Sequence, residues 1–195
     1  MPTRRAAVLV PALLIPAVVA GCGLDLSKFG ATNPAGGKPF EFTSAQWKFT
    51  ARFPAEPSKS TQNAPVPGGR TVPFTMFTAE FAGKDAGCVV GVADVPVPAG
   101  ASPTMLDAML DGARDGAVKN VKAKLTRSRE VTLDGKYPGR EFTATFTQPV
   151  KGQLRARIFL AGNRLYQVFV VGADEGGAVG SAEATAFLDS FAVTE

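Results

Sequence analysis

The sequence contains no histidine, and this absence removes several kinds of catalytic site at once. Histidine is the usual general base near neutral pH, the base of Ser-His-Asp triads and a frequent zinc ligand. No serine lies in a nucleophile elbow, and no glycine-rich loop follows a strand in the pattern that cradles phosphate. We therefore expect a protein that is not an enzyme and that holds no metal or cofactor.

Cysteine is also scarce, with Cys22 and Cys88 as its two positions. If Cys22 is modified, as argued below, Cys88 has no partner in the chain, and no disulfide framework can form. The apolar neighbours Val89 and Val90 favour a buried, inert thiol for Cys88. The alternative, a reactive thiol, requires an exposed and electropositive setting.

The excess of positive charge is small. The chain has 21 Lys and Arg against 17 Asp and Glu, a formal charge of +4. Loss of residues 1–21 would remove two arginines and lower this charge to about +2. No basic run is interleaved with aromatic residues as in single-strand binders, so we expect no nucleic-acid partner.

The N-terminus has the order of features of an export signal. Arg4 and Arg5 precede residues 6–20, a stretch with no polar side chain. This stretch is shorter than the 18 or more residues of a membrane-spanning helix, and Pro11 and Pro16 interrupt it. It is therefore typical of a secretory signal peptide.

The signal ends in Val19-Ala20-Gly21-Cys22, which resembles the bacterial lipobox. The resemblance implies cleavage before Cys22 and attachment of diacylglycerol to its sulfur; two or three acyl chains such as palmitate would then anchor the protein stably to a membrane. Gly23 stands where an inner-membrane retention signal usually has aspartate, which favours the outer membrane in an organism that has one. The alternative is an ordinary secretory signal that happens to end in cysteine.

Three segments are expected: a signal peptide (1–21), a lipidated cysteine with a flexible tether (22–40), and a single domain (41–195). The tether is rich in glycine, which favours a flexible chain. Two helices are predicted in the domain, one capped by Ser102 with Pro103 in its first turn and one opened by Ser181.

Alternating apolar and polar residues predict the strands. Four of them, at 124–133, 140–147, 154–160 and 165–171, form an antiparallel meander with turns at Asp134-Gly135, Lys151-Gly152 and Gly162-Asn163. Earlier strands are predicted at 47–53, 72–81 and 88–93, with a short one near 59–62. The fold class is therefore α+β, a meander sheet of about six or seven strands packed with two helices.

Local motifs within residues 42–193 resemble the PsbP-like family, named for an extrinsic subunit of photosystem II. They are Phe53-Pro54 with Pro57, the turn and strand from Leu133 to Glu141, the segment from Arg157 to Tyr166, and the terminal Phe187–Phe191. The resemblance implies an αβα sandwich that acts as a docking module. It implies no functional residues, because the matching positions are turns and core aromatics.

Three groups of charged residues are candidate sites. Asp107, Asp111 and Asp115 share one helix face and could hold calcium, although a solvated face is favoured because calcium ligands usually surround a loop. A basic run could meet anionic lipid or polymer, although a solvated edge strand is favoured. It comprises Lys119, Lys122, Lys124, Arg127 and Arg129.

The third group is a set of arginines on neighbouring predicted strands, which could grip a carboxylate or phosphate. Pairing with Glu141 or Asp174 would instead make these arginines structural, and this interpretation is favoured. The set comprises Arg140, Arg155, Arg157 and Arg164.

The sequence thus favours a membrane-anchored, non-enzymatic module of the cell envelope that docks a protein partner. The alternative is a lipoprotein that binds a small apolar or anionic ligand between the sheet and a helix.

Overall fold

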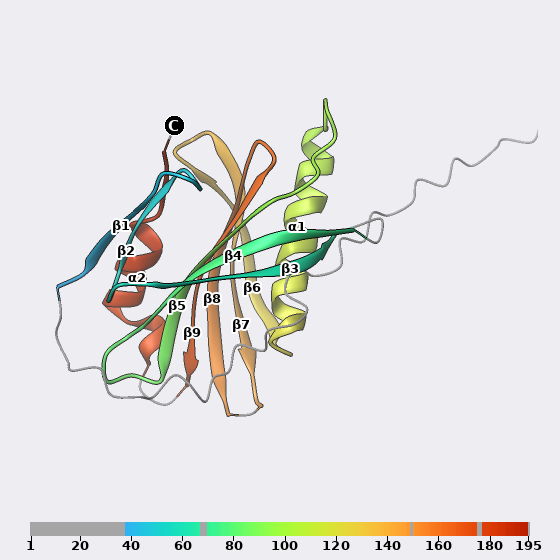
Figure 1. The fold of residues 1–195 in the computed structure, drawn as a ribbon. Helices are drawn as coiled ribbons and strands as arrows, with labels where there is room; N and C mark the ends of the chain where they lie inside the picture. Colours follow the sequence, from blue (N-terminus) through green and yellow to red (C-terminus); the bar gives the residue numbers. More distant parts are fainter. Residues whose placement is uncertain (1–37, 67–69, 149, 175–176, 195) are drawn as a thin grey trace, which may run out of the picture.

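The computed structural model describes residues 38–66, 70–148, 150–174 and 177–194. A seven-stranded antiparallel sheet in the order β3-β4-β5-β9-β8-β7-β6 forms the centre of the molecule (Figure 1). Its strands are β3 (Ser58–Val66), β4 (Arg70–Glu80), β5 (Ala86–Asp94), β6 (Lys124–Leu133), β7 (Tyr137–Phe146), β8 (Gly152–Ala161) and β9 (Arg164–Ala173). The predicted α+β meander is confirmed.

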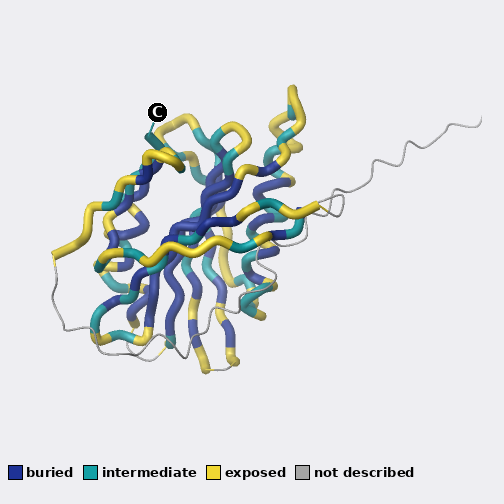
Figure 2. Tube along the Cα trace, viewed as in Figure 1, coloured by how far each residue is buried: buried dark blue, intermediate teal, exposed yellow. Residues whose placement is uncertain are grey.

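The two central strands, β5 and β9, are buried on both faces (Figure 2). In β5, Val89 belongs to one hydrophobic core, whereas Cys88 and Val90 belong to the other. Because side chains alternate along a strand, a strand that is apolar on both faces needs a covering layer on each side.

Helix α1 (Pro103–Asn120) covers one face, over β7 and β8 (Figure 1). The hydroxyl of Ser102 accepts a hydrogen bond from the backbone N–H of Met105, which confirms the predicted N-cap. Leu110 and Ala113 are buried against the sheet. Met105, in the first turn of the helix, is 41% exposed.

The other face is covered by a small second sheet and a short helix. The sheet comprises β1 (Phe40–Ser44), β2 (Phe49–Phe53) and β10 (Ala192–Val193), and the helix is α2 (Ala182–Asp189). The Tyr166 hydroxyl donates a 2.7 Å hydrogen bond to the carbonyl of Trp47, which fastens the β1–β2 hairpin to β9. Ser181 caps α2 as predicted.

Two of the predicted turns, at Asp134-Gly135 and Gly162-Asn163, are confirmed, and the third is placed differently. Asp134 and Gly135 both have positive φ, as a tight hairpin turn between twisted strands requires. The turn expected at Lys151-Gly152 ends earlier, because Gly152 is the first residue of β8. A Cβ at Gly152 would lie 2.3 Å from the ring of Phe146, so this glycine serves close packing.

Strand β1 was not predicted, since Phe40 was assigned to the tether and the domain was expected to start at residue 41. Both hydrophobic cores are built from residues between Phe42 and Val193, so this part of the chain carries what a folded domain needs. Within the described part of the chain, neither helix has the length and apolar character to cross a membrane.

Candidate functional site

Arg140 on β7 faces α1 and is almost fully buried, with 6% of its side chain exposed. Its Nε donates to Asp111 at 2.8 Å and its Nη2 to Asp107 at 2.9 Å. Arg114 donates to the same Oδ1 oxygen of Asp111 and also binds Asp115. The three aspartate side chains are 43–64% exposed, so they lie on a solvated helix face as the sequence favoured, and each is in addition paired with an arginine.

Arg155 and Arg157 on β8 face the opposite side of the sheet, toward α2. Arg157 donates to Glu141 at 2.7 Å and forms an ion pair with Asp189 on α2 at 2.7 Å. Arg155 donates to the hydroxyl of Thr185. These contacts hold α2 on the sheet, as the structural interpretation of this group expected.

Arg164, at the start of β9, contacts a different set of residues from the other three arginines. It pairs with Asp94 at 2.8 Å, and its guanidinium lies 5.2 Å from the centroid of the Trp47 ring. The four candidate arginines are thus not brought to one site. The reason is the alternation of side chains: Arg140 and Arg157, on adjacent strands, emerge on opposite faces of the sheet.

Glu141 is bound on both sides by arginines. Burial raises its pKa, but hydrogen bonds from Arg157 and Arg129 outweigh this effect, so the pKa of Glu141 lies below its ordinary value. Asp174, the other acid considered, binds Gln153. A carboxylate held charged between two guanidinium groups serves as a structural link and is a poor general acid.

Cys88 is completely buried within the core that faces α2. Burial raises the pKa of its thiol far above the ordinary value. The expectation of a buried thiol is confirmed, and thiolate chemistry is disfavoured. Cys22 lies outside the described residues.

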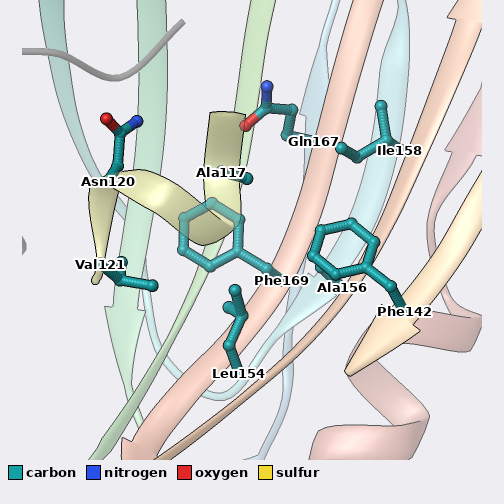
Figure 3. Close-up of a pocket in the computed structure, with 9 residues that line it drawn as sticks. All are labelled: Ala117, Asn120, Val121, Phe142, Leu154, Ala156, Ile158, Gln167 and Phe169. Atoms are coloured by element: carbon teal, nitrogen blue, oxygen red, sulfur yellow. The ribbon is translucent and has the colours of Figure 1, made fainter. Parts of the chain in front are cut away.

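A narrow crevice opens between the C-terminal half of α1 and the sheet (Figure 3). The space in it that a water molecule can reach measures about 20 Å³, which is room for about one water molecule. The lining is mostly apolar. It comprises Ala117, Asn120 and Val121 from α1 and its end, with Phe142, Leu154, Ala156, Ile158, Gln167 and Phe169 from β7, β8 and β9.

Two polar groups in this crevice have no partner. Among the described residues, three buried side-chain nitrogen or oxygen atoms lack a hydrogen bond, and two of them are Asn120 Nδ2 and Gln167 Oε1. Gln167 is 2% exposed, and Figure 3 shows both amides along the same crevice. An unsatisfied buried amide costs about 1–3 kcal/mol, so the crevice is a place where stability is sacrificed.

A second, larger groove of about 350 Å³ lies on the other side of the sheet, beside α2. Phe53, Phe81 and Phe187 are among its lining residues. Its two cations, Arg52 and Lys84, are already paired with Glu41 and Glu183. This groove is therefore large, but both of its cations are already bound by carboxylates of the protein.

The basic run follows the end of α1 into the edge strand β6. Arg129 pairs with Glu141. The other four side chains are exposed, and none makes a side-chain hydrogen bond or ion pair with the described part of the chain. These four are Lys119, Lys122, Lys124 and Arg127.

Sequence reasoning missed the crevice and its two amides, although one signal was present. Residues 165–171 were predicted as a strand, and Leu165, Gln167, Phe169 and Val171 share one face of it. A glutamine at this position interrupts a core-facing apolar series. The signal for Asn120 was absent, since an asparagine near a helix end is common.

Comparison with known proteins supports the fold. No family model and no curated protein matches the chain. The solution structure of cyanobacterial PsbP (CyanoP) from Synechocystis sp. PCC 6803 is similar to it, with a TM-score of 0.56 and 14% sequence identity. The match covers 85% of this chain and 99% of that one. The chain has a PsbP-like fold, as the sequence resemblance implied.

The ion pairs of Glu141 predict an acid-sensitive contribution to stability. Because its pKa is lowered by folding, this contribution is complete above the unfolded value of about 4.3 and disappears as pH falls through the folded value. Glu141→Gln should lower the free energy of unfolding by about 1–2 kcal/mol at pH 7. Urea denaturation at pH 7 and pH 3 should show this difference shrinking with acid.

The control is Glu130→Gln, which removes a carboxylate that is 81% exposed on the edge strand. It should change the free energy of unfolding by less than about 0.5 kcal/mol at either pH. A loss for Glu141→Gln that is as large at pH 3 as at pH 7 would contradict the ion-pair account.

The unpartnered amide predicts a substitution that increases stability. Gln167→Met keeps the shape of the side chain and removes the unsatisfied oxygen, so it should raise the free energy of unfolding by about 1 kcal/mol. Gln153→Met is the control, since that glutamine is exposed and bound to Asp174. Equilibrium urea unfolding measures both, and a clear loss of stability for Gln167→Met would show that this amide has a partner.

Proposed function

We propose that the protein is a non-enzymatic, membrane-anchored lipoprotein that binds a small, mainly apolar ligand in the crevice between α1 and the sheet. The observation that carries the proposal is the buried Gln167 oxygen without a partner in a lining whose other residues, apart from Asn120, are apolar. Ligand sites combine an apolar surface with a few placed polar groups, and a polar group left unsatisfied in the free protein can be satisfied by the ligand.

The narrowness of the crevice limits the shape of the ligand. In the free protein it has room for about one water molecule, so a ligand can enter only where the C-terminal end of α1 moves away from the sheet. An alkyl chain is the slimmest common apolar group, and each CH₂ that leaves water contributes about 0.8 kcal/mol. We therefore take a linear chain as the ligand body, with a hydrogen-bond donor able to reach Gln167.

A role in docking a protein partner, which the sequence favoured, stays a prediction. Such a role requires an exposed apolar patch of several hundred Å². Among the described residues, the exposed large hydrophobic side chains are Phe40, Met105 and Val150, and they lie on separate elements. This scatter supports ligand binding over docking.

The non-enzymatic part of the proposal rests on the lack of histidine and on the engagement of the charged groups. Glu141, Arg140 and Arg157 are all tied into ion pairs that hold helices on the sheet. A catalytic acid or base has to be free to exchange a proton with the substrate, and these ion pairs occupy the groups that would do so.

The anchor predicts the fate of one variant. Cys22→Ser removes the sulfur that would carry the lipid, so the precursor should keep residues 1–21 and remain uncut by the lipoprotein signal peptidase. Metabolic labelling with a palmitate analogue, followed by gel electrophoresis, should show a labelled mature protein for the natural chain and an unlabelled, larger one for the variant. Processing and release of the variant as a soluble protein would refute the lipid anchor.

Ligand binding is tested by titration calorimetry with 1-octanol, a linear chain whose hydroxyl can donate to Gln167. The domain (residues 38–195) is used first, and the full chain in phosphatidylcholine vesicles repeats the measurement against empty vesicles. Ala117→Leu fills the crevice and should weaken binding at least about tenfold, because each CH₂ kept out costs about 0.8 kcal/mol.

Ala108→Leu is the matched control, since Ala108 lies on the exposed face of the same helix. It should leave the affinity for 1-octanol unchanged. Binding that is absent in the natural chain, or equal in the Ala117→Leu and Ala108→Leu variants, would contradict a ligand site in the crevice.

A further inference from the structure

The face of the sheet that turns away from α1 is open to solvent along β6 and β7. Helix α2 packs against β2 and β9, and β7 and β6 lie further along the sheet, beyond β8 (Figure 1). Lys124, Arg127 and Thr145 on this stretch are exposed. An open part of a sheet that carries positive charge attracts anionic groups.

One row of residues across this face shows how the sheet binds a carboxylate. Arg129 on β6, Glu141 on β7 and Arg157 on β8 are directly opposite one another in the antiparallel pairing. Residues that are opposite in this way point to the same face of the sheet. Both arginines therefore reach the carboxylate of Glu141, Arg129 at 2.9 Å through Oε1 and Arg157 at 2.7 Å through Oε2.

The next row has the same two arginines without the acid. Arg127, Thr143 and Arg155 are opposite one another in the same three strands, with Thr143 in the position that Glu141 takes in the first row. Arg155 donates to the neutral hydroxyl of Thr185 on α2. Within the described ranges, neither arginine of this row has a carboxylate partner.

A third cation extends the unbalanced charge. Lys124 is opposite Thr145, one row further along β7 than Arg127, and it forms no ion pair with the part of the chain that the structure describes. Gln153, the third member of this row, binds Asp174, so that carboxylate is already engaged. Successive rows on one face are about 6.7 Å apart, because a strand rises about 3.3–3.4 Å per residue.

An extended peptide has the same spacing between alternate side chains. A segment with acidic residues at alternate positions can therefore place one carboxylate between Arg127 and Arg155 and the next one at Lys124. Arginine clusters recognise acidic motifs in a recurrent mode of peptide binding, which does not need the large apolar patch of rigid docking. The planar guanidinium group suits this task because it binds a carboxylate through two parallel N–H donors.

We infer that the open sheet face binds an extended acidic segment of a partner protein, one of whose carboxylates is held by Arg127 and Arg155 as Glu141 is held by Arg129 and Arg157. The occupant is a segment with several acidic residues, because carboxylates about 6.7 Å apart are needed to reach both rows. The site lies on the opposite face of the sheet from the crevice, so it is independent of the ligand proposed there.

The test compares the peptide Glu-Ser-Glu-Ser-Glu with Gln-Ser-Gln-Ser-Gln, which has a similar shape and no side-chain charge. Nuclear magnetic resonance titration of the domain (residues 38–195) at low salt should give at least about tenfold tighter binding for the acidic peptide, since charge-assisted hydrogen bonds supply a difference of this size. The preference should disappear near about 1 M NaCl, where the screening length falls to about 3 Å.

Arg127→Gln removes an exposed side chain, so the fold should persist while the affinity for the acidic peptide falls at least about threefold. The control is Arg70→Gln, which removes an exposed arginine from β4, in the opposite half of the sheet. It should leave the affinity unchanged. Succinate should bind at least about tenfold more weakly than the acidic peptide, because its two carboxylates are too close together to reach both rows.

Thr143→Glu supplies the missing carboxylate from within the chain. The variant should melt about 2–4 °C above Thr143→Gln, which has the same shape without the charge, because the new carboxylate lies between two arginines. It should also lose the preference for the acidic peptide, whereas Thr143→Gln should keep it.

Several results would overturn the inference. Equal binding of the two peptides, or a preference that persists in Thr143→Glu, would contradict a carboxylate site at Arg127 and Arg155. Succinate that binds as tightly as the acidic peptide would contradict a protein segment as the occupant. Binding to phosphatidylglycerol vesicles that Arg127→Gln abolishes, with no binding of the acidic peptide, would assign this face to a membrane surface instead.

Discussion

The ion pairs between Arg140 and two aspartates of α1 are the constraint on which the candidate site depends. They join β7 to the N-terminal half of the helix through a guanidinium that is almost entirely withdrawn from water. A buried charge that lost these partners would be strongly destabilising, so the helix cannot slide along the sheet without breaking them. In the C-terminal half of α1, the side-chain hydrogen bond to the sheet is a 3.3 Å contact from Arg114 to Ser128, and the crevice lies beyond it toward the helix end.

A sheet that is apolar on both faces imposes the rest of the architecture. One side is closed by α1, and the other by the β1–β2 hairpin and α2, which Tyr166 and Arg157 hold in place. The α2 side is packed with aromatic rings, whereas the α1 side ends in a crevice with two unsatisfied amides. The third unsatisfied atom among the described residues, Trp47 Nε1, lies on the α2 side, so it is the combination of two amides with an apolar crevice that led us to propose the α1 face as the ligand-binding face.

The sequence predicted the parts of this fold that depend on local chemistry. Examples are the cap residues Ser102 and Ser181 and the positive-φ turn at Asp134-Gly135. These features form through contacts between residues that are close in the sequence, so local sequence signals predict them. Strand β1 escaped because its stability comes from pairing with β2 and from packing of Phe42 against distant rings. That information is not present in a short stretch of sequence.

The candidate site was harder to predict for the same reason. Whether Arg140 and Arg157 meet depends on which face of the sheet each one occupies, and a shift of one residue in register reverses the answer. The crevice depends further on the position of α1 on the sheet, and contacts between residues distant in the sequence determine that position.

Nuclear Overhauser effects between a bound octyl chain and methyl groups of the domain test the central claim most directly. The crevice predicts contacts from the chain to Val121, Leu154 and Ile158, which line it. It predicts none to Val168 or Leu188, which belong to the core on the opposite face. Contacts confined to Val168 and Leu188, or none at a saturating concentration of chain, would contradict the account.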